Sequence, residues 1–163
     1  MPRLLRGIFR KPRELLLDLA QCAAEAVVEY VRRRLGPDCR PGIVVSIATA
    51  GDLAQWHPHG HLLVTDGDFS DDGAFHPLPS WGAEAVMKLA RERLLARLVE
   101  RHAISDELAR KLVTWTHPGF SSHVAEPIPF ENKKAIEDLA CYLVRAPFSL
   151  HKLVYLDGQQ AVL

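Results

Sequence analysis

The sequence from Trp56 to Gly67 reads Trp-His-Pro-His-Gly-His-Leu-Leu-Val-Thr-Asp-Gly and places three histidines within five positions. The apolar residues after the histidines and the closing Asp-Gly pair are typical of a β-strand that runs into a turn. Alternate side chains of a strand point to one face, so His59 and His61 are expected side by side. Two adjacent imidazoles are typical ligands of a divalent metal ion. A solvated loop of hydrogen-bonded histidines is the alternative interpretation.

Length and composition predict one domain of mixed helix and strand. The chain has 163 residues and 48% hydrophobic content, enough for one core and too little for two ordinary domains. Lys plus Arg and Asp plus Glu each number 20, so the net charge gives no overall field that would favour nucleic acid. Basic residues do cluster at 3–13 and 32–34, where they either follow phosphates or form a solvated helix face.

The cysteines and the apolar segments indicate an intracellular setting. Cys22, Cys39 and Cys141 are far apart and form no Cys-x-x-Cys pair, so neither a zinc ribbon nor a disulfide framework is expected. The amino terminus lacks the apolar core of a secretory signal, and charges interrupt the longest apolar stretch. We therefore expect a cytoplasmic protein that does not enter a membrane.

Four stretches have the periodicity of amphipathic helices. The first runs from Pro12 to Leu35, and a second runs to about Arg101 with Ser80 as its N-cap. A third, shorter helix starts at Ser105, and a last one lies between Phe130 and Pro147. The apolar stripe of the first helix comprises Leu16, Leu19, Ala23, Val27 and Val31.

The strands are predicted from β-branched runs and turn signals. Ile43–Thr49 is expected as a core strand that pairs antiparallel with the histidine strand through the connection Gly51–Trp56. An acidic turn, Asp68–Gly73, leads into a short edge strand, and Val113–Val124 indicates strand and loop. The pair Asp157-Gly158 predicts a hairpin near the carboxyl terminus. Together the elements predict an α+β domain.

The last predicted helix carries a second group of chemical residues. Its core stripe is Ile136, Leu139, Ala140 and Leu143, and the adjoining line is Ala135, Asp138, Tyr142 and Arg145. In one interpretation Tyr142 is an amphipathic residue at the edge of the core. In the other, its phenol attacks a phosphodiester that a divalent cation polarises, while a nearby Arg or Lys stabilises the equatorial oxygens.

The two groups of residues together resemble a known family. Residues 51–67 read Gly-Asp-(x)4-His-Pro-His-x-His-(apolar)3-Thr-Asp-Gly, and residues 140–153 read Ala-Cys-Tyr-(apolar)2-Arg-Ala-x-Phe-Ser-x-x-(basic)-Leu. In this order they resemble the HUH-type tyrosine transposases of rolling-circle insertion sequences. The likeness extends nearly from end to end and includes residues 115–120.

The resemblance implies an endonuclease that nicks and joins single-stranded DNA at transposon ends. In that family the paired histidines hold Mg²⁺ or Mn²⁺, which assigns this role to His59 and His61. The nucleophile corresponds to Tyr142, which would form a 5′-phosphotyrosine link and release a 3′-hydroxyl. Arg145 and Lys152, the basic residues of the second motif, are expected to contact DNA. The implied fold is a central antiparallel sheet that carries the histidine strand, flanked by helices, with the tyrosine helix lying across it.

The sequence departs from the family pattern in three ways. The middle position of the histidine motif is usually bulky and is Gly60 here, which loosens the strand. Some members have two tyrosines four residues apart, but residue 146 is Ala, so the single-tyrosine form is expected. Full-length members also carry an amino-terminal zinc-binding segment and a carboxyl-terminal extension. We therefore expect residues 1–163 to form one catalytic domain that is truncated at both ends relative to the family.

Several assignments stay open at this point. A third metal ligand is to be sought among His57, Asp52, Asp66 and Asp138. Trp56, Trp115 and Phe120 are able to stack on unpaired bases, although core packing is expected for at least two of them. The alternative functions are an inactive transposase remnant that binds single-stranded DNA, and a small metalloenzyme that holds zinc with the three clustered histidines. No motif indicates the DNA target sequence or the oligomeric state.

Overall fold

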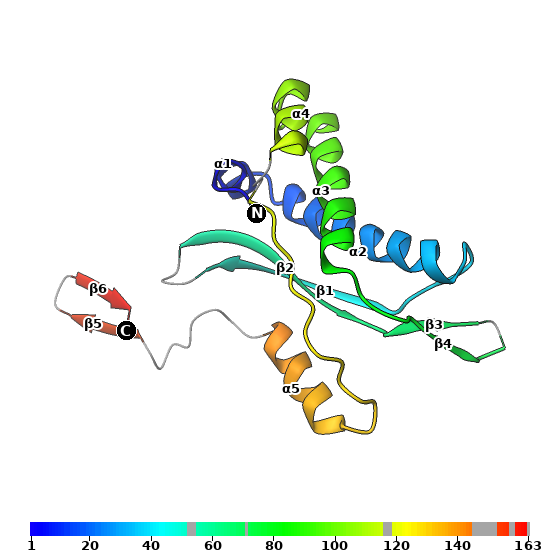
Figure 1. The fold of residues 1–163 in the computed structure, drawn as a ribbon. Coiled ribbons are helices and arrows are strands. Elements are labelled where there is room, and N and C mark those ends of the chain that lie inside the picture. The colour runs from blue at the N-terminus through cyan, green and yellow to red at the C-terminus, as the bar shows by residue number, and fades with distance from the viewer. Residues whose placement is uncertain (52–54, 71, 116–118, 145–152, 157–158, 163) are drawn as a thin grey trace.

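A computed structural model describes residues 1–51, 55–70, 72–115, 119–144, 153–156 and 159–162 (Figure 1). Within these ranges the chain contains five α-helices, a short 3-10 helix and three antiparallel two-stranded sheets. This mixture confirms the predicted α+β class. None of the described helices is long and apolar enough to cross a membrane.

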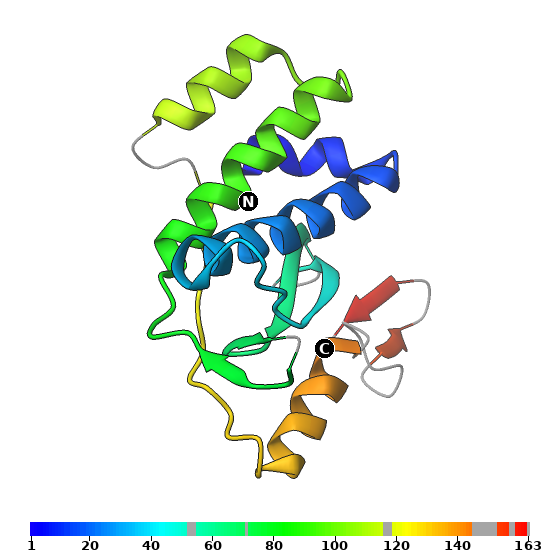
Figure 2. The ribbon, with the colours of Figure 1, turned by 90° about the vertical axis from the view of Figure 1, so that its right-hand side faces the viewer.

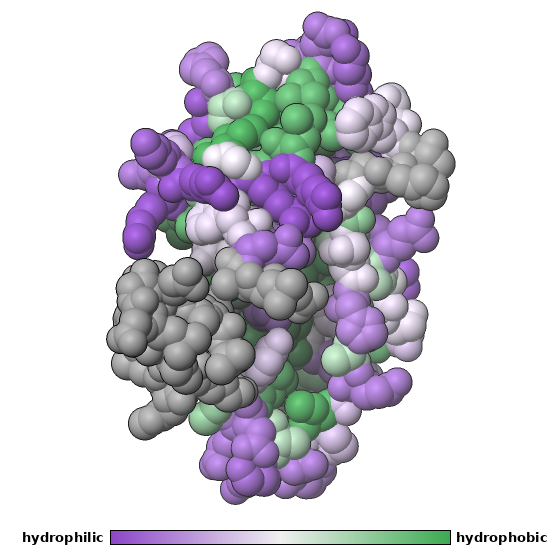
Figure 3. All heavy atoms as spheres, turned by 90° about the vertical axis from the view of Figure 1, so that its left-hand side faces the viewer, coloured by the Kyte–Doolittle hydropathy of each residue, from purple (hydrophilic) through white to green (hydrophobic). Residues whose placement is uncertain are grey.

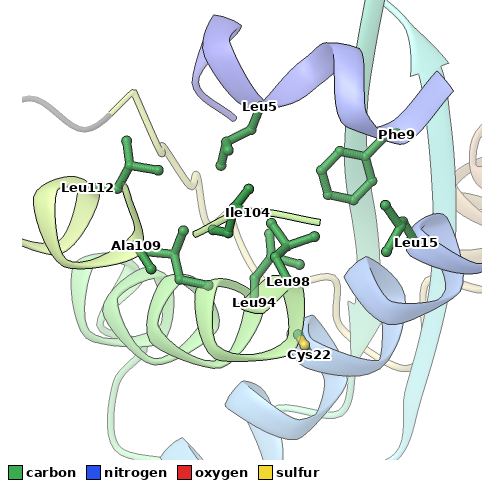
Figure 4. Packing of buried hydrophobic residues seen from close by; sticks show 10 residues of the cluster. Leu5, Phe9, Leu15, Cys22, Leu94, Leu98, Ile104, Ala109 and Leu112 are labelled. Atoms are coloured by element: carbon green, nitrogen blue, oxygen red, sulfur yellow. The ribbon is translucent and has the colours of Figure 1, made fainter. Parts of the chain in front are cut away.

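Most of the helices lie together on one side of the molecule. They are α1 (Arg3–Arg6), η1 (Gly7–Arg10), α2 (Glu14–Leu35), α3 (Ala83–Glu100) and α4 (Asp106–Thr114). The strands lie beneath this group, and α5 (Lys133–Val144) lies on the far side of the strands (Figures 1 and 2). Buried residues from α1 to α4 and their connections form the main core (Figure 4): Leu5, Phe9, Leu15, Cys22, Leu94, Leu95, Leu98, Ile104, Ala109 and Leu112. On the face shown in Figure 3, apolar side chains gather at this helical end and hydrophilic ones form a band below them.

The buried face of α2 differs from the predicted stripe. The helix has the expected span, and Gly36 ends it with a positive φ of 128°. Its buried residues are Leu15, Asp18, Cys22, Ala26, Val27, Tyr30 and Val31, whereas Leu16, Leu19 and Ala23 are half-buried. The cause is that α2 is covered from two directions, by α3 and by the strands. Asp18 tolerates burial because Arg97 of α3 and Arg101, which directly follows α3, form ion pairs with its carboxylate at 3.2 and 3.0 Å.

The strands β1 (Ile43–Ala50) and β2 (Trp56–Val64) form an antiparallel ribbon. This pairing confirms that they are antiparallel neighbours, with Ser46 opposite His61. The expectation of a larger sheet with a central histidine strand is not met, because within the described residues β2 pairs with β1 alone. The expectation of a buried core strand is also wrong, since no residue of β1 is fully buried. The main covering of this two-stranded ribbon comes from α2 on one face, so the residues of β1 stay partly exposed.

The two faces of the ribbon have different neighbours. Leu62 and Val64 of β2 pack against Val27 and Val31 of α2. Side chains alternate along a strand, so His57, His59 and His61 project from the opposite face. That opposite face is the one on which α5 lies.

A second hairpin corrects two predictions about the segment after the histidines. β3 (Gly67–Phe69) pairs with β4 (Phe75–Pro77), so the predicted edge strand exists. Asp68, however, belongs to β3 rather than to a turn, and its buried carboxylate accepts a hydrogen bond from the backbone N–H of Arg40 at 2.5 Å. The Asp-Gly pair at 66–67 lies where β2 passes into β3 and makes no hairpin turn of its own.

Of the two predicted helix caps, one is confirmed and the other is wrong. The Ser105 hydroxyl accepts a hydrogen bond from the Leu108 backbone N–H, which confirms the start of α4. Ser80 does not cap α3, which begins after Gly82. The carbonyl of Ser80 instead accepts a hydrogen bond from the Tyr30 hydroxyl. This contact between α2 and the segment before α3 joins residues far apart in the sequence, so a local pattern cannot indicate it.

The remaining segments follow the predictions in part. Of the strand and loop predicted at 113–124, the described residues contain only loop after α4, which continues to Thr114, and residues 116–118 lie outside the described part. The last helix starts at Lys133, a little later than Phe130. The predicted carboxyl-terminal hairpin is confirmed by β5 (Leu153–Leu156) and β6 (Gln159–Val162).

Candidate active site

A row of half-buried imidazoles runs along the face of β2 that is turned away from α2. The ring centroids of His57 and His59 are 5.3 Å apart, and those of His59 and His61 are 4.8 Å apart. Strand alternation produces this row, because the three histidines occupy every second position. The strand continues through Gly60 without a break, so the glycine does not prevent the alternation.

The phenol of Tyr142 meets the end of this row. Its ring lies edge-on to the ring of His61, with centroids 5.4 Å apart and an angle of 83° between the ring planes. The Tyr142 side chain remains 55% exposed, so its hydroxyl group is not enclosed by the core. Two residues singled out from separate motifs therefore lie in direct contact in the fold.

Local contacts hold α5 in this position. Asn132 starts the helix, since its side-chain oxygen accepts a hydrogen bond from the backbone N–H of Ala135 at 3.1 Å. At the other end Leu143 is buried, and its carbonyl accepts a hydrogen bond from the hydroxyl of Ser46 at 2.6 Å. Of the rest of the predicted stripe, Ile136 and Leu139 are half-buried and Ala140 is exposed. The carboxyl-terminal end of α5 is thus the end that is fixed against the ribbon.

The imidazoles are arranged to present nitrogen lone pairs. His59 Nδ1 lies 2.7 Å from the carbonyl oxygen of His57, so Nδ1 carries the proton that it donates and Nε2 keeps its lone pair. For His61, partial burial and the neighbouring His59 lower the pKa of the imidazole. A lowered pKa favours the neutral ring, and the neutral ring is the form that binds metal ions.

Comparison with known proteins places these residues in a family. Residues 42–163 match the family model described as "Y2_Tnp: Putative transposase". The chain belongs to this transposase family. The matched region contains both β2 and α5, and therefore the whole histidine–tyrosine contact.

A curated relative supports the same assignment. The transposase chain is 29% identical over 167 residues to "Transposase for insertion sequence element IS801" from Pseudomonas savastanoi pv. phaseolicola. The alignment covers 95% of this chain and 40% of the relative, so the chain spans well under half of that protein's length. No solved structure matches the chain.

Of the candidate third ligands that the structure describes, His57 continues the histidine row, whereas Asp66 and Asp138 have other partners. Asp66 accepts a hydrogen bond from the Trp81 indole N–H at 2.6 Å, and Asp138 forms an ion pair with Lys134 one turn away. Asp52 lies outside the described residues. Across the described ranges, no three His, Cys, Asp or Glu side chains are placed to share one metal ion.

The expected DNA-contacting residues of the transposase chain are only partly described. Arg145 and Lys152 lie outside the described residues. Trp56 and Phe120 pack against the helical core, as expected for two of the three aromatic residues. Trp115 is 47% exposed and is the one of the three that is open to a base.

Sequence reasoning missed Ser46, which joins the two motifs. It stands in a β-branched run and has no motif of its own. Only the strand register, which places it opposite His61, could have indicated that it faces the tyrosine helix.

Proposed function

We propose that this chain is the nicking and joining core of a transposase that acts on single-stranded DNA. Tyr142 is its nucleophile, and His59 and His61 bind its metal ion. The contact between the Tyr142 and His61 rings at 5.4 Å is the observation that carries the proposal. It unites a residue suited to covalent catalysis with a residue suited to metal binding on an exposed surface.

His59 and His61 fit two ligand positions of one divalent cation. The Nε2 atom of His59 is available because its Nδ1 is engaged with a carbonyl, and the lowered pKa of His61 keeps that ring neutral. Mg²⁺ or Mn²⁺ bound there would polarise the scissile phosphate and neutralise part of its charge. A further ligand remains open between His57, which continues the row, and the carboxylates of Asp52, Asp66 and Asp138, whose oxygen donors suit Mg²⁺.

The covalent step is a transesterification. The Tyr142 oxygen attacks the phosphorus, the bond from phosphorus to the 3′-oxygen breaks, and a 5′-phosphotyrosine link forms. The phenol loses its proton, and the departing 3′-oxygen gains one to become a hydroxyl. Arg145 and Lys152 are proposed to stabilise the charge on the phosphate oxygens. The reverse reaction rejoins a strand without a nucleotide cofactor, because the link conserves the bond energy.

The first experiment tests for the covalent link. The chain is incubated with Mn²⁺ and a pool of labelled single-stranded oligonucleotides, and denaturing electrophoresis reports the protein–DNA adduct. Tyr142→Phe is expected to abolish the adduct, because the ring remains and the attacking oxygen is lost. Tyr30→Phe serves as the matched control, since the Tyr30 hydroxyl bonds to Ser80 and Gly82 in the helical part.

The outcomes separate the proposal from its alternatives. An adduct that persists in Tyr142→Phe would refute the role of this tyrosine. If the unchanged chain binds Mn²⁺ and single-stranded DNA but forms no adduct, the inactive remnant is the better description. If it binds Zn²⁺ tightly through the histidine row and is indifferent to DNA, the metalloenzyme alternative replaces both.

A further inference from the structure

One serine hydroxyl connects the strand of the candidate metal ligands to the helix of the candidate nucleophile. Ser46 lies on β1 directly opposite His61 of β2. Directly opposed residues of an antiparallel pair point to the same face of the sheet, with Cβ atoms about 5 Å apart. Ser46 therefore shares the face of the histidine row, and its position is fixed by the same ladder that fixes His61.

The acceptor of this hydroxyl is a group of the tyrosine helix that needs a partner. Ser46 Oγ donates to the backbone carbonyl of Leu143 at 2.6 Å, and Leu143 follows Tyr142 directly in α5. The last four carbonyl groups of a helix receive no hydrogen bond from the helix backbone. A side-chain donor therefore satisfies one of them at low cost.

We infer that Ser46 is a positioning residue for Tyr142, an inference that rests on the proposed function. Two residues that face each other across the strand pair both contact the tyrosine helix. His61 contacts the phenol ring, and Ser46 holds the backbone next to Tyr142. In-line attack requires the phenol oxygen at a fixed place, and a displacement of about 1 Å lowers such a rate by roughly a hundredfold. Ser46 sets this place without touching DNA or metal.

The test compares two substitutions of nearly the same shape. Ser46→Thr keeps the hydroxyl, and Ser46→Val replaces it with a methyl group, while both side chains suit a strand. Ser46→Val is expected to lower the single-turnover rate of adduct formation by about tenfold or more at saturating Mn²⁺ and oligonucleotide. Ser46→Thr is expected to retain the rate, and neither change is expected to alter the affinity for Mn²⁺.

A matched control and a second readout keep the test independent of folding. Ser122 Oγ donates to the backbone carbonyl of Ala83 at 2.8 Å, so Ser122→Val removes the same kind of bond from α3 instead of α5. Fluorotyrosine labelling gives a ¹⁹F signal for Tyr142, assigned by its loss in Tyr142→Phe. The signal is expected to shift or broaden in Ser46→Val and to stay unchanged in Ser122→Val.

Each result decides a different claim. An unchanged adduct rate together with an unchanged ¹⁹F signal in Ser46→Val would overturn the inference. Equal losses of rate in Ser46→Val and Ser122→Val would also overturn it, because the effect would then be one of general stability. If the unchanged chain forms no adduct, the proposed function fails, and the ¹⁹F signal alone decides whether Ser46 holds the tyrosine in place.

Discussion

The helices on the two faces of the β1–β2 ribbon differ in how firmly they are held. α2 has seven buried residues among 22, whereas α5 has one, Leu143, among 12. α2 is also bound to α3 by ion pairs from Asp18, Glu25 and Glu29, while the ion pair recorded for α5, between Lys134 and Asp138, lies within the helix. One face of the ribbon packs against buried residues of α2, and the other carries the half-buried histidines and the exposed Tyr142 of α5.

The residues that pack against the core and the candidate site residues therefore lie on opposite faces of the same two-stranded sheet. Leu62 and Val64 are half-buried against α2, and the three histidines that precede them in β2 face the opposite way. A helix packed on the histidine face as tightly as α2 packs on the other would exclude a DNA strand. The sparse packing of α5 therefore suits the proposed role of Tyr142 as an exposed nucleophile, and local stability is expected to be lowest there.

The largest expected effect comes from truncating one buried leucine in the helical core and one in α5. Leu98 is fully buried among residues of α1, α2 and α4, so Leu98→Ala is expected to lower the free energy of unfolding by about 2–5 kcal/mol. Leu143→Ala is expected to cost less than about 2 kcal/mol, because Leu143 belongs to none of the three clusters of buried residues in the described part of the chain. Urea denaturation followed by far-UV circular dichroism measures both. Equal costs would show that the two faces are packed alike.

Cysteine reactivity offers a second, smaller contrast between the helices. Burial raises the pKa of Cys22 in α2 to about 11, so at pH 8 roughly one part in a thousand is thiolate. Cys141 in α5 is exposed. We expect an alkylating reagent to modify Cys141 at least tenfold faster than Cys22, as measured by mass spectrometry after timed labelling.

The same raised pKa predicts a direction with pH. Between about pH 9 and pH 11 the unfolded thiol of Cys22 ionises while the folded one keeps its proton. Stability from this group is therefore complete below pH 9 and is lost as the pH rises toward 11. Cys22→Ala should remove this part of the decline of the free energy of unfolding with rising pH. For the labelling experiment, comparable rates for Cys22 and Cys141 would contradict the expected difference between the two helices.

The smallest expected effect concerns the glycine between the candidate ligands. A Cβ atom at Gly60 would lie 3.6 Å from Leu62 Cδ1 and 3.7 Å from Ile47 Cδ1, which are ordinary contacts. Gly60→Ala should raise the free energy of unfolding by about 0.5–1 kcal/mol, because glycine loses more backbone freedom on folding. Gly67→Ala is the control, since its Cβ would lie 2.2 Å from the His76 carbonyl oxygen and φ is +156°. A loss of stability in Gly60→Ala would mean that the strand requires glycine there.

Local sequence patterns were sufficient to predict most helices and strands and the row of histidines. Period-two alternation predicts that His59 and His61 share a face, and helical periodicity gives the span of α2. The cap at Ser105 follows from one residue type before an apolar run. Each of these features depends on residues within one or two turns of each other, so the sequence specifies them directly.

Features that depend on distant residues were not predictable. Burial of Asp18 requires the arginines at the end of α3, and the role of Ser80 requires Tyr30 of α2. Neither partner is indicated by periodicity. The family resemblance implied only that the tyrosine helix lies across the histidine strand, and the ring contact of Tyr142 with His61 was not predicted, because no rule of spacing relates a late helix to an early strand.

The hydrogen bond between Ser46 and Leu143 also bears on the order in which the molecule is assembled. It joins residues 97 positions apart, whereas the β1–β2 ribbon closes over a few residues. Closing the longer loop costs roughly 2 kcal/mol more chain entropy than bringing Ser46 opposite His61. During synthesis the histidine strand emerges well before α5, and domains begin to fold from the amino terminus. We expect the nucleophile to dock last, so that a ribosome-bound chain stalled before residue 133 would already bind metal but form no adduct with DNA.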